Sequence, residues 1–311
     1  MSLTMTVPVH KPVLLSETVE VLQAQPGKRY IDCTLGSGGH ATAILEKILP
    51  DGQLLGIDAD PEATEIAKTR LANYRKSTII INDNFANLET ICRENNFLPV
   101  QGILFDLGIS STQLEISERG FSFQHDGPLD MRFSPTQELT AADIVNILPE
   151  DKLSQIIKAY GEEHQSKRIA RYIIKSRSIS STHQLASIIQ KAVGSRRTKI
   201  HPATKTFMAL RIAVNRELEN LYTALKQAVN CLDHQGRLVV ISYHSLEDRL
   251  VKQFMLQESK KCLCPPSIPV CQCGHIPSLK IISKKVITPS LIEIKSNPRS
   301  RSAKLRVAER F

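Results

Sequence analysis

Short apolar runs alternate with amphipathic segments over the first 110 residues. Three runs of β-branched or apolar residues each end in Asp, Asn or Gly: GQLLGIDADP (52–61), STIIINDNF (77–85) and VQGILFDLGISS (100–111). Between them, residues 62–75 and 86–96 carry apolar positions at helical spacing. Continuous apolar runs are typical of buried parallel strands, so the alternation predicts a doubly wound α/β sheet with ligands at the carboxyl ends of its strands.

The alternation stops after Ser111. From about Gln113 to Arg211 amphipathic helical stretches follow one another, with no convincing strand. Sheet character returns at GRLVVISYHS (236–245). The segment before it predicts one long helix, because apolar residues recur there at steps of three and four. These residues are Phe207, Leu210, Val214, Leu218, Leu221 and Leu225.

Two further strand-like runs, KKVITPSLIEI (284–294) and SAKLRVAER (302–310), close the chain. We expect them to form an antiparallel pair at the sheet edge, which nicotinamide-binding domains usually lack. The predicted organisation is one sheet domain built from residues 1–112 and 213–311, interrupted by an all-helical inserted domain over 113–212.

The positive charge of the chain is concentrated in one region. Its formal net charge is +9, yet residues 151–216 hold fourteen Lys or Arg against three acidic residues, and the rest is close to balanced. A localised basic surface predicts a polyanionic partner such as nucleic acid. A solvated helical face is the simpler alternative. With 5% aromatic residues and no Trp, a protein that binds single strands purely by stacking is disfavoured.

The composition of the chain further limits the class of protein to which it can belong. A chain of 311 residues, 41% of them hydrophobic, can bury a substantial core. No run approaches the ~20 apolar residues of a membrane span, and the N-terminus lacks a signal-peptide pattern. Seven cysteines, an odd number, argue against a secreted disulfide framework. We expect a cytoplasmic protein that makes no membrane contact. The oligomeric state, a homodimer included, stays open.

The stretch YIDCTLGSGGHATAI (30–44) reads as a strand, a glycine turn and a helix. Gly36, Gly38 and Ala41 fit the G-x-G-x-x-A fingerprint of nicotinamide dinucleotide sites. Counted from Asp32, the same turn is similar to that of nucleic-acid amino methyltransferases, which bind S-adenosylmethionine. Asp58 lies twenty residues after Gly38, where a carboxylate can accept hydrogen bonds from the ribose hydroxyls of either cofactor. The turn, Asp58 and the terminal strand pair together favour the methyl donor.

The whole chain resembles the bacterial 16S ribosomal RNA cytosine-N4 methyltransferase family RsmH (MraW). The resemblance rests on motifs spread from end to end: HKPVLLSE (10–17), DCTLGSGGHA (32–41), FDLGISSTQL (105–114), RGFSF with DGPLDMRF (119–133), HPATKTFMALRIAVNREL (201–218), ISYHSLEDR (241–249) and NPRSRSAKLR (297–306). It implies a Rossmann-like domain interrupted by a helical substrate-recognition domain. It also implies S-adenosyl-L-methionine as cofactor and a cytosine in the decoding region as acceptor. We expect 16S rRNA within the small ribosomal subunit as the partner, and naked 16S rRNA stays open as an alternative substrate.

The resemblance also implies the cofactor contacts. These are Gly38, Gly39, His40, Asp58, Phe85, Asp106 and Gln113. We expect Phe85 to end the third strand and cover the adenine, although a core role would look the same, and His40 could equally be a packing or capping residue. Other amino methyltransferases place Asp-Pro-Pro-Tyr or Asn-Pro-Pro-Tyr after the fourth strand, whereas this chain has DLGIS (106–110) there. Asp106 occupies that position and is the candidate catalytic acceptor for the N4 amine.

Short polar groups near strand ends and in loops are the candidates for substrate binding. They are Asp130, Arg132, Ser242, His244, Arg299 and Arg301. Hydrogen bonding within loops is the alternative for the first four, and His244 could be a proton acceptor or a structural histidine. A base inside folded RNA must be extruded to reach a methyl donor, so basic segments would hold the phosphates.

Four cysteines form two C-x-C pairs at Cys262, Cys264, Cys271 and Cys273. Four thiols so close could bind zinc, but C-x-x-C is the more usual spacing. From sequence we prefer reduced thiols without a metal. A nicotinamide-dependent oxidoreductase and an RNA-binding assembly protein without turnover are the alternatives to a methyltransferase.

Overall fold

The computed structural model describes residues 12–194, 200–265, 268 and 270–311, with the side chains of 111 and 112 excepted. Three basic residues of the charge count, Arg196, Arg197 and Lys199, lie outside the described residues. The chain divides into two compact units. One comprises 1–108 and 220–311, and the other comprises 109–219.

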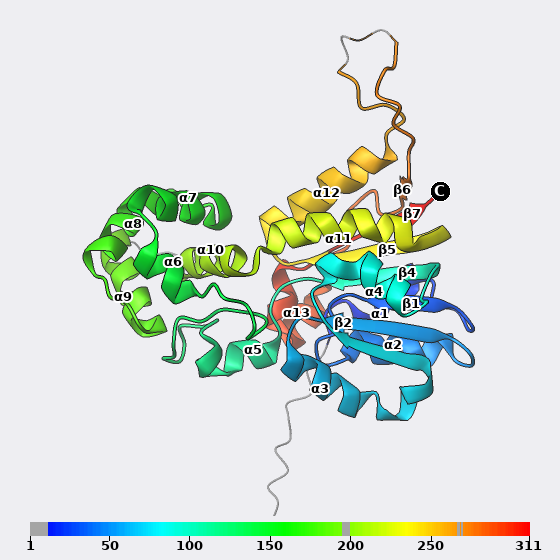
Figure 1. The fold of residues 1–311 in the computed structure, drawn as a ribbon, viewed down its shortest axis with the longest axis horizontal. Helices are drawn as coiled ribbons and strands as arrows, with labels where there is room; N and C mark the ends of the chain where they lie inside the picture. The colour runs from blue at the N-terminus through cyan, green and yellow to red at the C-terminus, as the bar shows by residue number, and fades with distance from the viewer. Residues whose placement is uncertain (1–11, 195–199, 266–267, 269) are drawn as a thin grey trace, which may run out of the picture. The chain divides into compact units, whose positions relative to one another are not determined.

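The first unit is built on one seven-stranded sheet (Figure 1). Its order is β3-β2-β1-β4-β5-β7-β6, and β1 to β5 pair in parallel. The strands are β1 (Arg29–Asp32), β2 (Gln53–Asp58), β3 (Thr78–Asn82), β4 (Val100–Asp106), β5 (Leu232–Ser242), β6 (Leu279–Ile281) and β7 (Lys304–Arg310). The predicted doubly wound sheet is confirmed.

Helices cover both faces of this sheet. Successive residues of a strand point to opposite sides, and here both sides carry apolar residues that pack against helices. Ile31 packs in the same cluster as Leu88 and Val251, whereas its neighbour Tyr30 packs with Ile44 and Ala67. The helices of this unit are α1 (Leu15–Leu22), α2 (Gly39–Ile48), α3 (Pro61–Arg70), α4 (Leu88–Glu94), α12 (Ser245–Ser259), α13 (Leu291–Ser296) and most of α11 (Glu217–Cys231).

An antiparallel strand pair at the sheet edge is confirmed, but one of its two strands was predicted in the wrong place. β7 pairs antiparallel with β5 and with β6, yet β6 is Leu279–Ile281 rather than 284–294. Within 284–294 the chain forms one isolated bridge at Ile287 and then α13. Ser290 starts this helix because its hydroxyl accepts the Glu293 N–H at 3.1 Å. Leu291 and Ile292 stay about four-fifths exposed.

The second unit is helical, and its described part contributes no strand to the sheet. A single apolar cluster, including Ile144, Ile157, Ile173 and Leu210, holds its helices together. These are α5 (Ser111–Glu115), α6 (Ala141–Ile147), α7 (Glu150–Gly161), α8 (Ser166–Lys175), α9 (Thr182–Val193) and α10 (Thr204–Asn215).

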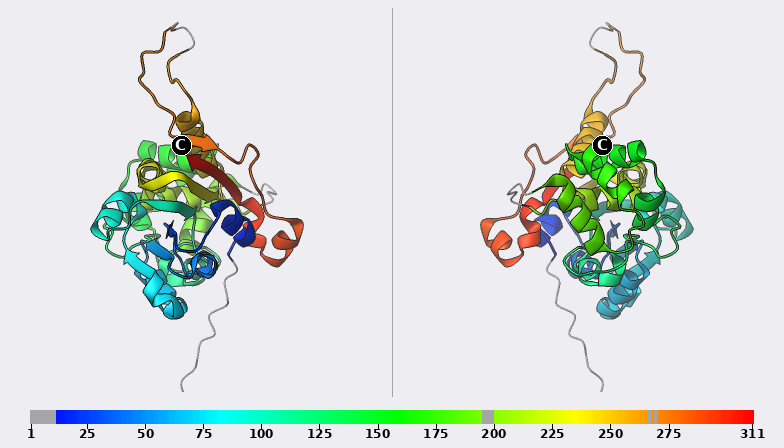
Figure 2. Two further views of the ribbon diagram at one scale, coloured as in Figure 1. Left: turned by 90° about the vertical axis from the view of Figure 1, so that its right-hand side faces the viewer. Right: turned by 90° about the vertical axis from the view of Figure 1, so that its left-hand side faces the viewer.

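The single long helix expected over 207–225 is wrong. The chain forms α10 and α11, and Arg216 between them adopts a left-handed conformation with φ 49°. Apolar periodicity continues across the break, which is why the pattern alone did not reveal it. No helix in the described part of the chain is long and apolar enough to cross a bilayer. Figure 2 shows the same ribbon from two further sides.

Candidate active site

The glycine turn joins the end of β1 to the start of α2. Asp32, the last residue of β1, is buried, and its Oδ1 accepts the Thr34 N–H at 3.2 Å. Gly36 and Gly38 have φ angles of 50° and 79°, a region that L side chains rarely adopt. The turn therefore needs glycine at these two positions.

Asp58 ties this turn to the end of β2. Its Oδ2 accepts the Gly36 N–H at 2.7 Å, and its Oδ1 accepts the Asp60 N–H at 2.9 Å. The Asp60 side chain in turn accepts the Glu62 N–H and starts α3, with Pro61 in the first helical position. The Asp58 carboxylate is thus fixed between the glycine turn and a helix start, as expected of a group that orients a ligand.

Asp106 lies at the end of β4 within a small polar network. Tyr243 Oη donates to its Oδ1 at 2.7 Å, and His40 Nδ1 lies 3.5 Å from its Oδ2. Its backbone N–H donates to Thr34 Oγ1 at 2.6 Å. Burial raises the pKa of Asp106 to about 7, although the Tyr243 hydrogen bond opposes this shift. About 18% of the side chain remains exposed, so a ligand can reach it.

Strand register brings three carboxylates to one edge of the sheet. Asp32 pairs with Gly56 in β2 and with Leu104 in β4, so Asp58 and Asp106 each lie two residues beyond the paired position. Burial raises the pKa of Asp32 to about 6, His40 opposes the shift, and the negative charges of Asp106 and Asp58 add to it. Asp32 Oδ2 is buried without a hydrogen-bond partner among the described residues.

This arrangement fits a cationic ligand better than an anionic one. Three neighbouring carboxylates would repel the pyrophosphate of a nicotinamide dinucleotide, whereas a sulfonium ion would offset their mutual repulsion. The order 3-2-1-4-5-7-6, with its antiparallel β7, also departs from the 3-2-1-4-5-6 order of dinucleotide-binding sheets. Neither observation favours the oxidoreductase interpretation.

Among the glycine-turn residues, His40 is held by packing. It is 5% exposed, and its Nε2 lies 3.0 Å from the Val13 carbonyl oxygen. Burial lowers its pKa, so the ring is neutral near pH 7. Gly39 is required by the chain itself, because a Cβ there would lie 2.4 Å from Pro12 Cγ. Cofactor contact by Gly38, Gly39 and His40 stays a prediction.

Phe85 does not end the third strand as expected. β3 ends at Asn82, and Phe85 begins a short 3-10 helix (Phe85–Asn87) because the Asn84 side chain accepts the Ala86 N–H. Its ring meets Phe105 edge-on at 5.7 Å and is partly buried against the core. A core role is therefore established for Phe85, and adenine contact stays a prediction.

Gln113 lies in α5 of the helical unit. Its side-chain oxygen accepts the Ser110 N–H at 3.1 Å, and its own N–H donates to Ser110 Oγ. These bonds shape the start of α5, and contact with the cofactor stays a prediction.

Asp130 and Arg132 form hydrogen bonds within their own loop. The guanidinium donates to both Asp130 carboxylate oxygens, at 3.0 and 2.7 Å. It also donates to the carbonyls of Pro135 and Gln137. Because Arg132 is already committed to four acceptor atoms of its own loop, the loop-stabilising alternative is the better description of this pair.

The remaining substrate candidates fall into two groups. Ser242 is buried at the end of β5, and His244 caps α12 because its Nδ1 accepts the Glu247 N–H at 3.3 Å. In that cap the Glu247 carboxylate accepts the Tyr243 N–H, so His244 acts as a structural residue here. Arg299 and Arg301 are exposed in a 3-10 helix (Pro298–Ser302).

Tyr243 and Thr34 form hydrogen bonds with Asp106, and neither was singled out as a site residue from sequence. Tyr243 follows β5 directly, and Asp106 pairs with Ile241 in the register, two residues before it. Burial and the Asp106 charge raise the pKa of Tyr243 well above its usual range, so it stays protonated as a donor. The strand-end position was its only sequence signal.

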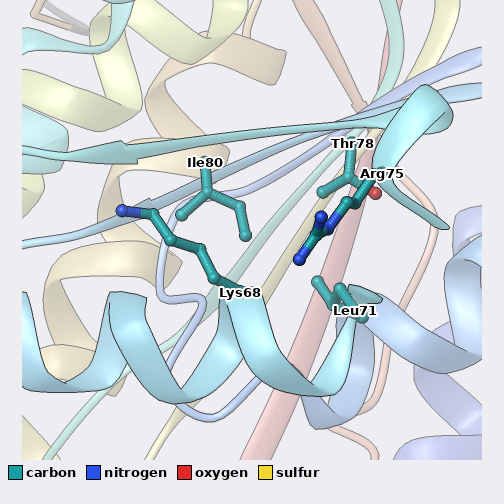
Figure 3. A pocket seen from close by; sticks show the side chains of 5 residues that line it. All are labelled: Lys68, Leu71, Arg75, Thr78 and Ile80. Atoms are coloured by element: carbon teal, nitrogen blue, oxygen red, sulfur yellow. The ribbon is translucent and has the colours of Figure 1, made fainter. Parts of the chain in front are cut away.

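One cavity of about 270 Å³ is lined by Lys68, Leu71, Arg75, Thr78 and Ile80 (Figure 3). It lies between α3 and β3, and none of the predicted site residues line it. Two basic side chains face it, in contrast to the carboxylates at the strand ends.

The sheet order, the glycine turn and the clustered carboxylates define an α/β methyltransferase that uses S-adenosylmethionine as its cofactor. Residues 8–311 match the model of the MraW methylase family. The chain therefore belongs to the MraW methylase family, as the sequence motifs indicated.

The chain is similar to named relatives over nearly its whole length. A Dehalococcoides mccartyi protein named ribosomal RNA small subunit methyltransferase H is 60% identical over 302 residues, which cover 97% of this chain and 86% of the relative. A protein of the same name from Thermomicrobium roseum is 52% identical, over 97% of this chain and 94% of its own. One from Syntrophus aciditrophicus is 47% identical, over 97% and 98%.

Proposed function

We propose that this protein methylates N4 of one cytosine in the decoding region of 16S ribosomal RNA, in the small ribosomal subunit or a precursor of it. The relatives named as small-subunit RNA methyltransferases, 60% identical over nearly the whole chain, support this substrate. The observation that carries the proposal is the row of carboxylates Asp32, Asp58 and Asp106 beside the glycine turn. With an RNA substrate the protein works in the cytoplasm.

Bound S-adenosylmethionine supplies an electrophilic methyl group on a sulfonium centre. Asp58 would hold the ribose hydroxyls, because its carboxylate is already fixed at the end of β2. Gly36 and Gly38 let the backbone approach the ligand closely. Asp106, with Tyr243 fixing one oxygen, would place negative charge near the cationic end.

Cytosine N4 is a weak nucleophile because its lone pair is delocalised into the ring. It must lose a proton once it has taken the methyl group, so an acceptor nearby helps the reaction. We assign this second role to Asp106, because a carboxyl with a pKa of about 7 matches the working pH of a general base. Tyr243 is a positioning residue that acts through Asp106.

The helical unit is the proposed substrate-recognition domain. In α8, Lys167, Arg168, Arg171 and Lys175 are exposed, whereas Ile169, Ala170 and Ile173 are buried. Lys167, Arg171 and Lys175 are spaced by four residues and share one face of the helix. Such a basic stripe suits the phosphates of an RNA strand and gives no base specificity by itself.

Mass spectrometry of digested RNA tests the proposal. Small subunits and naked 16S RNA lacking the modification are incubated with protein and labelled donor, and the modified nucleoside and its position are identified. N4-methylcytidine at one decoding-region position is expected. A methyl group on a ring carbon would contradict the assigned reaction, and RNA binding without turnover would favour the assembly-protein alternative.

A further inference from the structure

In the segment between α12 and β6, residues 260–278, the described residues extend away from the sheet and form no helix or strand (Figures 1 and 2). We call it the cysteine loop. Ser278 closes its base, since its N–H donates to the Glu258 carbonyl at 2.9 Å and its hydroxyl to the Glu258 carboxylate at 2.6 Å. None of its described residues is buried, and Val270 and Ile276 are 70% and 81% exposed. No apolar core therefore explains its conformation.

Four sulfur atoms lie close together where the two sides of the cysteine loop approach each other. The Sγ atoms of Cys262, Cys264, Cys271 and Cys273 all lie within 4.8 Å of one another. Two of these separations are 3.5 Å, for Cys271 to Cys273, and 3.8 Å, for Cys273 to Cys262. Both are far longer than the ~2.05 Å of a disulfide bond. A tetrahedron with metal–sulfur bonds of ~2.3 Å has edges of about 3.8 Å, close to the separations found.

Backbone amides surround the same sulfur atoms. The Leu263 N–H donates to Cys273 Sγ at 3.4 Å, the Cys264 N–H to Cys262 Sγ at 3.3 Å, and the Gln272 N–H to Cys264 Sγ at 3.4 Å. Such donors orient thiolate ligands and offset the negative charge that four thiolates around a divalent ion retain. Two of the three bonds link the two C-x-C pairs across the loop.

From this geometry we infer that the cysteine loop is a structural zinc site with Cys262, Cys264, Cys271 and Cys273 as its four ligands. A complete set of four thiolates leaves no open coordination position, so the ion has a structural role. The thiols give up their protons as the metal binds. Because no apolar core orders this loop, the binding free energy of the metal ion would fix its conformation. This inference differs from the metal-free thiols that we prefer from sequence.

The test measures metal in the full-length protein purified with reductant. We expect one zinc per chain in the wild type, loss of zinc in the C271S/C273S double variant, and retention in C92A, which removes a buried thiol elsewhere. Cobalt substitution should give the ligand-field bands of a tetrahedral four-sulfur site in the wild type and in C92A, but not in the double variant.

Two further measurements separate this site from the methyltransferase function. The double variant should still show the wild-type melting shift with S-adenosylhomocysteine, which proves that it is folded, while a protease should cleave its cysteine loop at least tenfold faster. A wild-type protein that neither contains zinc nor takes it up on titration would overturn the inference. Disulfides among the four cysteines, bound iron, or a cobalt spectrum without four sulfur ligands would overturn it equally.

Discussion

The Tyr243 hydroxyl donates a 2.7 Å hydrogen bond to the Asp106 carboxylate, which joins the ends of β5 and β4. This bond lowers the pKa of Asp106, and burial raises it by more, to about 7. Activity should therefore rise with pH through about 7, because the base must be ionised. In Y243F the rise should move upward by about one to two pH units, since a hydrogen bond to a charged group is worth roughly 1.5–3 kcal/mol and one pKa unit is 1.36 kcal/mol.

The measurement is the pH profile of kcat/KM, which reports the free enzyme. Y222F changes a partly exposed tyrosine on α11 and should keep the wild-type profile. An unshifted profile in Y243F would show that this hydrogen bond does not tune the base.

Asp58 should control binding of the donor without controlling binding of RNA. D58A removes the acceptor for the ribose hydroxyls, so the Kd for S-adenosylhomocysteine should rise by ten- to a hundred-fold or more, as expected for lost hydrogen bonds to a charged group of roughly 1.5–3 kcal/mol each. Calorimetry gives the Kd, and a filter assay follows the RNA. D51N, at an exposed acidic residue, is the control. Unchanged turnover in D58A would refute the assignment.

The buried carboxylates should make the protein less stable as the pH rises. The folded-state pKa values of Asp32, about 6, and Asp106, about 7, lie above 3.8. The folded state thus holds these protons more tightly, and the stability they contribute is present at low pH and lost between about pH 4 and 7. D106N should therefore be more stable than the wild type at pH 8 by on the order of 1–3 kcal/mol.

Denaturant unfolding at pH 5 and pH 8 measures this difference, and D106N should be nearly inactive although it is more stable. Comparing variant with wild type at each pH removes the opposite contribution of carboxylates such as Asp248, whose bonds to Arg306 and Lys304 lower its pKa despite partial burial. A destabilised D106N at pH 8 would contradict the prediction.

The basic stripe of α8 should govern RNA affinity. Replacing Lys167, Arg171 and Lys175 with Glu should weaken binding and reduce the slope of log K against log salt by about one for each lost phosphate contact. Donor binding should stay unchanged. The matching control is a triple Glu variant of Lys47, Lys76 and Lys252, which are exposed lysines of the sheet unit. Equal salt slopes in the two variants would argue against a role for α8.

Local sequence patterns were sufficient to select a candidate site residue where its position follows from its own strand. Asp58 and Asp106 end apolar runs, and the runs form parallel strands as predicted. The role of Tyr243 depends instead on β5 lying beside β4, a pairing between segments more than a hundred residues apart. Hydrophobic periodicity carries no information about such pairing.

Helix capping explains two further differences between the prediction from sequence and the structure. Ser290 and Glu293 start a helix inside an apolar run that looked like a strand, so Leu291 and Ile292 lie exposed. His244, considered as a proton acceptor, forms a capping box with Glu247. In both cases a local hydrogen bond to a backbone N–H decides the conformation, and the apolar pattern does not.

A structure of the protein with S-adenosylhomocysteine tests the central claim most directly. The account predicts the ligand at the glycine turn, with its ribose hydroxyls on the Asp58 carboxylate and its sulfur on the side of Asp106. A ligand found elsewhere, for example in the cavity lined by Lys68 and Arg75, with the turn unoccupied, would contradict it.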